Sequence, residues 1–231
     1  MARTFNDSAS NYMSRGSVNL GLNGVTEFSM AYWISLTAVN ATLPQRVCQK
    51  QIADGWSTVT SYFNTNTAVP TFSPENQTLA QSPTWDLTEG ITVGTWTRVL
   101  FTWKRNAIAA SDGVIYKNGS PVPSTYTANG YTAALVLEET SNNLHYGIRP
   151  VSLTQPLNAS LSWVCIWNRQ LTSQEAYDDF RHPLNVTSGL VHRVQLSPDT
   201  DGSGNGNDMS VTGTLATLSG PREETLAWSR A

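Results

Sequence analysis

Charged residues are scarce in this chain: Asp, Glu, Lys and Arg make up 13% of its 231 residues, about half the share usual in soluble domains. The formal net charge is −3, and Lys and Arg do not cluster. A protein that binds nucleic acid through its phosphates needs such a cluster, so no nucleic-acid partner is expected. No apolar run approaches the roughly 20 residues of a membrane-spanning helix, so no membrane partner is expected either.

Cysteine is also scarce: Cys48 and Cys165 are too few for a disulfide-stapled scaffold. Cys165 lies in an apolar, strand-like segment, which favours two buried thiols over a disulfide between them. The residues from Met1 to Ser8 contain no apolar stretch of the kind that forms a secretory signal. Six Asn-x-Ser/Thr sequons are therefore interpreted as chance products of a composition rich in Asn, Ser and Thr: Asn6, Asn40, Asn76, Asn118, Asn158 and Asn185.

What the chain does have is apolar alternation, which predicts core strands. Between Glu27 and Leu36, large apolar residues occupy every second position and mostly small ones lie between them. The segment from Thr95 to Trp103 is a second such strand. The segment from Leu161 to Trp167 is apolar on both faces, which is typical of a strand between two layers. Strict alternation places four of its residues on one face: Leu161, Trp163, Cys165 and Trp167.

Local signals predict one helix and several turns. Thr172 and Glu175 match a capping box, in which each side chain accepts an amide hydrogen at the helix start, and this predicts a short helix after the third strand. Asn118-Gly119 predicts a type I′ turn in a hairpin from Gly113 to Val122, and Asp54-Gly55 predicts another hairpin. The segment from Ser17 to Leu22 is expected to be a short strand.

Two stretches are harder to assign. The segment from Thr65 to Gly90 contains three prolines and little periodicity, so it is interpreted as a long surface excursion or as one containing a short edge strand. In the tail, a further strand is expected from Gly189 to Leu196, then a Gly-rich turn, and strand character again from Met209 to Gly213.

Four segments of the chain resemble, in order, the motifs of laminin-G-like domains of the concanavalin A-like lectin/glucanase superfamily. The 27–36 strand resembles F-T-x-x-x-W, and the 95–103 strand resembles W-x-H-V-A-x-T with Arg98 where His is common. The 113–122 hairpin resembles L-Y-V-N-G-x-x-V, and the 143–148 segment resembles L-x-I-G. The resemblance implies an all-β fold, an antiparallel jelly-roll β-sandwich (concanavalin A-like) with one short helix and a C-terminal β-arm. We expect the sandwich over residues 1–187 and the arm over residues 188–231, packing on the sandwich or on a neighbour.

The motifs of catalysis are missing. Glycosidases of this fold carry Glu-x-Asp-x-x-Glu along one strand, and no such spacing occurs here. Glu138 and Glu139 are adjacent, so on a strand they would face opposite sides. Neither a nucleophile elbow, a P-loop nor a dinucleotide fingerprint appears, and the three histidines lack metal-ligand spacing. We therefore expect a protein that is not an enzyme.

Two groups of residues are candidate ligand contacts. Calcium is the candidate cofactor, because the loop from 199 to 208 offers oxygens from Asp199, Asp201, Asn205 and Asp208. A Gly-rich turn formed for local reasons is the favoured interpretation of this loop. Trp56 and Trp85 lie in turn-like or Pro-rich segments, where an exposed ring could stack on a sugar, so they are the candidate carbohydrate-binding residues.

Three functional classes follow. A fold normally used outside cells, in a chain without a secretion signal, favours a non-enzymatic structural or decoration protein of a bacteriophage virion, synthesised in the host cytoplasm. Its partners would be capsid or tail proteins, copies of itself in a homo-oligomer, or surface glycans. The alternative is a carbohydrate-binding, lectin-like module. A glycoside hydrolase is the least favoured class, because its carboxylates are missing.

Overall fold

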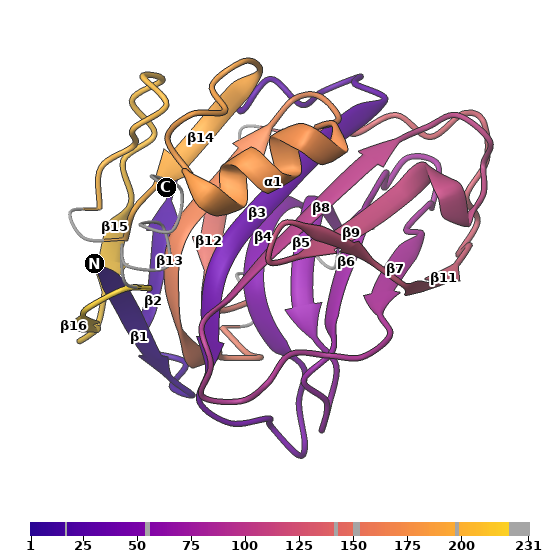
Figure 1. Cartoon of the computed structure of the whole chain (residues 1–231). Helices are drawn as coiled ribbons and strands as arrows, with labels where there is room; N and C mark the ends of the chain where they lie inside the picture. Colours follow the sequence, from indigo (N-terminus) through magenta and orange to yellow (C-terminus); the bar gives the residue numbers. More distant parts are fainter. Residues whose placement is uncertain (17, 54–55, 141–142, 150–152, 197–198, 222–231) are drawn as a thin grey trace.

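The computed structural model is a sandwich of two antiparallel sheets with one α-helix (Figure 1). It describes residues 1–16, 18–53, 56–140, 143–149, 153–196 and 199–221. Sheet A runs in the order β10 (Ser120–Val122), β9 (Gly113–Lys117), β8 (Thr97–Lys104), β3 (Glu27–Leu36), β13 (Asn158–Trp167), β1 (Ala2–Asn6) and β16 (Ala216–Leu218), with β14 (Leu190–Val194) also paired to β13. Sheet B runs in the order β11 (Ser124–Thr127), β7 (Thr84–Leu87), β6 (Pro70–Pro74), β5 (Trp56–Phe63), β4 (Gln45–Ala53), β12 (Leu144–Tyr146), β2 (Tyr12–Arg15) and β15 (Ser210–Thr212). The helices are α1 (Ser173–Arg181) and the short 3₁₀ segment η1 (Ala110–Asp112). The predicted all-β jelly-roll class is confirmed.

The main core lies between the inner faces of the two sheets. The large alternating residues of β3 all belong to it, as predicted: Phe28, Met30, Tyr32, Ile34 and Leu36. Stacked aromatic rings join the sheets across the core. The ring of Phe72 in β6 lies 5.9 Å from that of Tyr32 in β3 and 5.1 Å from that of Phe101 in β8.

Strand β13 carries a bulge that strict alternation did not predict. Its register with β3 shifts between Ser162 and Cys165, and Trp163 has a φ of 46°. An extra residue in a strand sends every later side chain to the opposite face. Leu161 therefore lines the main core, whereas Cys165 and Trp167 face a second apolar cluster beneath α1. The expectation that these residues and Trp163 share one face is wrong, and Trp163 is half-buried.

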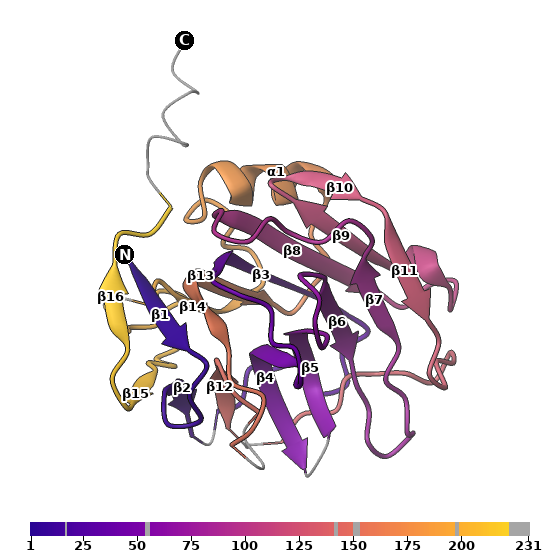
Figure 2. The ribbon, with the colours of Figure 1, turned by 90° about the horizontal axis from the view of Figure 1, so that it is seen from below.

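Helix α1 covers the outer face of sheet A. It begins with the predicted capping box, in which Thr172 Oγ1 accepts from Glu175 N and the Glu175 carboxylate accepts from Thr172 N. Its Phe180 ring lies 5.6 Å from that of Trp33 in β3. Figure 2 shows α1 on the side of sheet A that faces away from sheet B.

A buried ion pair fastens α1 to the sheet. Arg98 of β8 donates from Nε and Nη2 to the two carboxylate oxygens of Asp179, each at 2.8 Å. A third donor of Arg98, Nη1, reaches the carbonyl oxygen of Trp163 in the bulge at 2.5 Å. Both charged side chains are buried, at 1% and 0% exposure. Helix, bulge and central strand are thus held by one guanidinium.

Two sequence-based assignments of strands are wrong. The Pro-rich stretch is not an excursion, because β6 lies inside sheet B between β5 and β7 and all its residues are buried. Pro70 and Pro74 lie at its two ends, which is where a strand tolerates a residue without an amide hydrogen. Residues 18 to 22 do not form a strand. The amides of Leu20 and Leu22 instead donate to the carboxylate of Glu139, each at 2.7 Å.

The two predicted hairpins are present. Asn118 and Gly119 have φ values of 51° and 79°, as a type I′ turn requires. Strands β4 and β5 pair as expected, while the Asp54-Gly55 turn between them lies outside the described residues.

Both cysteines are free and buried, as expected, in separate apolar clusters. No helix in the described part of the chain is long and apolar enough to cross a membrane.

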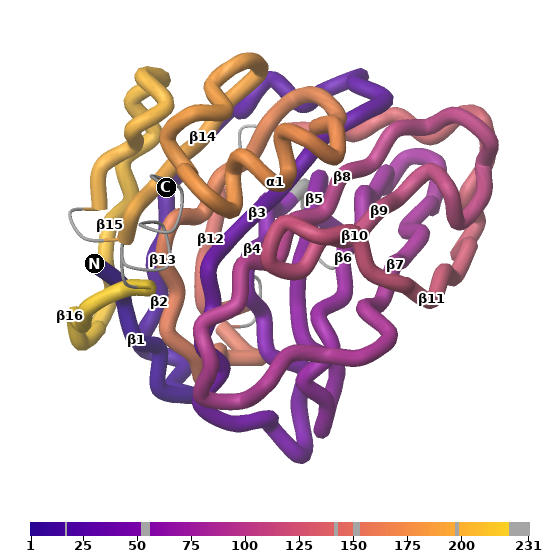
Figure 3. The backbone as a smooth tube through the Cα atoms, viewed as in Figure 1, coloured from indigo at the N-terminus to yellow at the C-terminus, as the bar shows by residue number. Residues whose placement is uncertain are grey.

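The C-terminal segment packs on both sheets. Strand β14 pairs with β13 and β16 with β1 in sheet A, and β15 pairs with β2 in sheet B. Figure 3 shows this yellow segment beside the indigo N-terminal strands. Arg3 of β1 holds it through a bidentate ion pair with Asp199 at 2.7 and 3.2 Å. Up to residue 221, the arm therefore lies on its own sandwich, and the division of the chain at residue 188 stays a prediction.

We expect Asp179→Leu to lower the free energy of unfolding by about 3–5 kcal/mol, because it leaves the Arg98 guanidinium buried without its counter-charge. The double variant Arg98→Met/Asp179→Leu should lose far less, since no buried charge then remains. Urea unfolding of Arg98→Met, Asp179→Leu and the double variant measures this as a double-mutant cycle. A double variant that loses the full sum of the two single losses would show that the pair is not coupled.

Candidate functional site

The outer face of sheet B is lined by polar side chains that point away from the core. The register places Arg46 beside Tyr62, Gln49 beside Thr60, and His145 beside Gln49. The intervening positions of these strands lie in the core. We call this surface the polar face, and it consists of Arg46, Gln49, Thr60, Tyr62, Thr71, Ser73, Glu75, Asp86 and His145. Figure 2 shows that α1 covers the other sheet.

Arg46, the second residue of β4, is held on the polar face by three side-chain contacts. Its Nη1 donates to Thr60 Oγ1 at 2.7 Å, and its Nη2 donates to Gln155 Oε1 at 2.8 Å. The guanidinium lies over the ring of Tyr62, 4.5 Å from its centroid. These contacts fix the orientation of the guanidinium, so its position is set before any ligand arrives.

Two carboxylates lie on the same face. Glu75 follows β6, is 8% exposed, and accepts a hydrogen bond from Ser57 N at 2.7 Å. Burial raises the pKa of Glu75 to about 7, although that hydrogen bond and the charges of Arg46 and Arg149 act in the opposite direction. Asp86 of β7 accepts a short hydrogen bond from Thr71 Oγ1. A carboxyl group that is half-ionised near neutral pH is common at functional sites.

Three buried polar atoms of this face have no hydrogen-bond partner: Arg46 Nε, Gln49 Oε1 and His145 Nδ1. Each such atom costs about 1–3 kcal/mol relative to a satisfied one. Burial also lowers the pKa of His145 to about 4, although a hydrogen bond with the backbone of Asn143 acts in the opposite direction, so its imidazole is neutral at physiological pH. Three of the ten buried polar atoms that have no partner in the described residues therefore lie on this one outer face.

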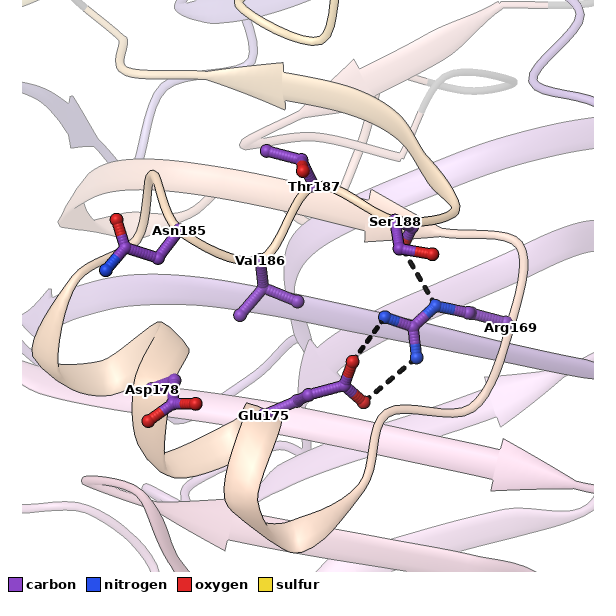
Figure 4. Close-up of a pocket in the computed structure, with 7 residues that line it drawn as sticks. All are labelled: Arg169, Glu175, Asp178, Asn185, Val186, Thr187 and Ser188. Carbon is purple, nitrogen blue, oxygen red and sulfur yellow. Dashed lines mark hydrogen bonds and ion pairs between the residues drawn. The ribbon is translucent and has the colours of Figure 1, made fainter.

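A second concave surface lies between α1 and the chain leading into β14 (Figure 4). Its volume is about 440 Å³, and its lining is Arg169, Glu175, Asp178, Asn185, Val186, Thr187 and Ser188. Arg169 forms a bidentate ion pair with Glu175 at 2.6 and 2.9 Å and donates from Nε to Ser188 O at 2.8 Å. The hydrogen bond from Arg169 lowers the pKa of Glu175 to about 2. These charges are used to hold the helix start, so we prefer the polar face as the functional site.

The structure separates the two candidate tryptophans. Trp85 is 0% exposed, packs among Phe101, Tyr126 and Tyr131, and donates from Nε1 to Ala110 O at 2.9 Å. The expected exposure of Trp85 is therefore wrong, because β7 turns its ring into the core. Trp56 begins β5 and is half-buried. A role for Trp56 in sugar binding stays a prediction.

The candidate calcium loop is closed by its own side chains. Asp201 accepts from the backbone amides of Arg193, Ser203 and Asn207 at 2.9–3.0 Å. Asp208 accepts from Asp201 N, and Asp199 pairs with Arg3. Asn205 donates its amide to Val191 O at 3.1 Å. Within the described residues, no group of three or more acidic, His or Cys side chains is arranged to hold a metal ion. These contacts favour the turn over a metal site.

A family model described as the concanavalin A-like lectin/glucanases superfamily, Laminin_G_3, matches residues 7–176. The chain belongs to this family. No curated protein matches the sequence. Among solved structures, the chain is similar to the heptameric SAP-like pentraxin of Limulus polyphemus, with a TM-score of 0.58, 12% identity, and coverage of 91% of this chain and 94% of that one.

Two further structures are similar to this member of the Laminin_G_3 family. One is a proposed carbohydrate-binding protein of Bacteroides ovatus, with a TM-score of 0.64, 12% identity and coverage of 95% of this chain. The other is the binding domain of botulinum neurotoxin serotype G, with a TM-score of 0.56, 14% identity and coverage of 76% of this chain. The chain spans 60% and 41% of the lengths of these two proteins. At such identities, the likeness shows the fold, which is that of a lectin-like domain.

We expect acid to destabilise this protein partly through His192, which lies beneath the Asp201 turn. His192 is fully buried, neither ring nitrogen has a hydrogen-bond partner, and Nδ1 lies 3.9 Å from Asp201 Oδ1. Burial lowers its pKa to about 4, against the attraction of Asp201 and Asp208. The unfolded chain binds this proton near pH 6.5, so stability should fall by up to about 3 kcal/mol as pH drops from about 6.5 to about 4.

Urea unfolding at several pH values tests this prediction. His192→Gln should flatten the loss of stability over that range, with His182→Gln as the matched control variant. An unchanged pH profile in His192→Gln would contradict it.

Proposed function

We propose that this protein is a carbohydrate-binding module without catalytic activity, and that the polar face of sheet B binds the glycan. The observation that carries the proposal is the cluster of buried, unsatisfied polar atoms on that face. Such a cluster adds no stability to the fold, whereas a hydroxyl-rich ligand could supply the missing donors and acceptors.

The chemistry of the polar face suits a sugar. The amide of Gln49 both donates and accepts, and the guanidinium of Arg46 only donates; each is planar and can bind two neighbouring hydroxyls. The hydroxyls of Thr60 and Ser73 lie beside them. Because Gln49 Oε1 and His145 Nδ1 are buried, we expect the side chains of Gln49 and His145 to rotate when the ligand binds, whereas Arg46 stays in place. Membership of a superfamily of lectins and glucanases supports the same proposal.

A non-catalytic role fits the carboxylates. Glu75 and Asp86 come from different elements, and each already accepts a hydrogen bond from a neighbour. The strand spacing that aligns acid and nucleophile in glycosidases of this fold does not occur in the sequence. We therefore propose binding without turnover.

A structural place on a virus particle is a second proposal and is compatible with glycan binding. Strand β16 lies at the edge of sheet A with all its residues exposed, and such an edge can pair with another chain. Mass spectrometry of purified particles tests this role. Absence from every particle would remove it and leave the proposed glycan binding in place.

Gln49→Met tests glycan binding against stability. It removes the unsatisfied Gln49 Oε1 with little change in volume, so we expect the unfolding free energy to be unchanged or higher by about 1 kcal/mol. If the amide serves the ligand, affinity on a glycan array should fall about tenfold or more, as loss of one or two hydrogen bonds predicts.

Gln174→Met, on the exposed side of α1, is the matched control and should leave glycan binding unchanged. A folded wild-type protein that binds no glycan on a broad array would overturn the proposal. Full binding by Gln49→Met would remove the polar face as its site.

A further inference from the structure

Two arginines come together at the polar face. Beyond β12 the chain continues along β4, since Gly147 N donates to Val47 O at 3.1 Å and Arg46 N donates to Gln155 O at 3.0 Å. Arg149 lies in this continuation, where its backbone amide donates to Thr154 O at 2.9 Å. The positive charge of Arg149 interacts electrostatically with the side chains of both Arg46 and Glu75. Thr154, which pairs with Arg149, precedes Gln155, which accepts from both the backbone amide and Nη2 of Arg46, so the two arginines lie on neighbouring segments beside the face.

These arginines have donors to spare. A guanidinium has five N–H donors. Arg46 uses one on Thr60 and one on Gln155, and its Nε is unsatisfied. The half-buried side chain of Arg149 makes no hydrogen bond to another described residue. An acceptor-rich ligand group would fit this surplus of donors.

The negative charges nearby do not balance the arginines. Asp86 is hydrogen-bonded by Thr71 on a more distant strand of sheet B. Glu75 interacts electrostatically with both arginines. Because burial raises the pKa of Glu75 to about 7, its carboxyl group is only partly ionised near neutral pH. Two positive charges thus face less than two negative ones. Because Arg46 is half-buried, the imbalance is costly, and an anionic ligand would relieve it.

We propose that the glycan bound at the polar face is acidic, and that Arg46 and Arg149 bind its anionic group, a carboxylate or a sulfate ester. This inference rests on the proposed glycan-binding function. The stacking of Arg46 on Tyr62 and its hydrogen bonds hold the planar fork ready for two oxygens of such a group. Gln49, Thr60 and Ser73 would then bind hydroxyls of the same or the next sugar.

Two matched pairs of polysaccharides test this with the full-length protein. Polygalacturonate and its methyl ester differ in the carboxylate, and dextran sulfate and dextran differ in the sulfate. Affinity electrophoresis or calorimetry should show binding at least about tenfold tighter to the charged member of one pair, and the pair that discriminates identifies the anionic group.

Variants then assign the preference to residues. Arg46→Gln and Arg149→Gln should each abolish the preference for the charged polymer, and Arg46→Lys should reduce it because the fork is lost. Lys104→Gln, on sheet A, removes the same charge elsewhere and should leave the preference unchanged. Thermal melting checks that each variant is folded. If Arg46→Gln does not fold, the charge preference of Arg149→Gln alone tests the inference.

Three results overturn the inference in distinguishable ways. Equal binding of charged and neutral polymers would remove the acidic ligand but leave the glycan-binding function. A charge preference that survives in both arginine variants would place the anion elsewhere. No binding to any polysaccharide would remove both proposals.

Glu75→Gln supplies an independent readout. In the wild type, affinity for the charged polymer should decrease as pH rises from about 6 to about 8, because Glu75 gains a negative charge beside Arg46. The polymer itself stays ionised over this range. Glu75→Gln should keep the affinity of the low-pH form throughout, and an unchanged decline in this variant would contradict the role given to Arg46.

Discussion

The guanidinium of Arg98 contacts three separate parts of the chain, and the arrangement of sheet A depends on it. Two of its nitrogens bind Asp179 in α1 and a third binds the carbonyl of Trp163 in β13. Taking both charges out of water is costly, and only such close bidentate geometry offsets the cost. The main effect of the pair is therefore to specify where the helix lies and where the strand bulges. Its net contribution to the free energy of unfolding is smaller.

That constraint gives the two outer faces different roles. On sheet A the bulge turns Cys165 and Trp167 outward, and α1 covers them in a second apolar cluster. On sheet B the outward positions are Arg, Gln, Thr, Ser, Tyr and carboxylates instead. An apolar outer face needs a cover, whereas a polar one does not. The sequence of each strand therefore decides which outer face α1 covers and which is lined by polar side chains.

Sequence patterns predicted the elements whose signals are local. The alternation of β3, the Asn118-Gly119 turn and the Thr172–Glu175 capping box each depend on residues within one turn or strand. The failures depend on distant partners. The bulge at Trp163 is held by Arg98. The segment near Leu20 does not form a strand, because its backbone amides donate to the carboxylate of Glu139. Trp85 is buried because β7 joins an internal β6, which its prolines had concealed.

The polar face was missed for a related reason. In β4 the polar residues Arg46 and Gln49 are three apart, and the bulge near Val47 obscures the two-residue period that would mark them as one face. Only the register with β5 and β12 places them beside Thr60 and His145. The lone aromatic rings that drew attention in the sequence can serve a core as well as a sugar. Buried polar atoms without partners have no such structural use, so the proposed binding surface depends on the fold and not on residue types alone.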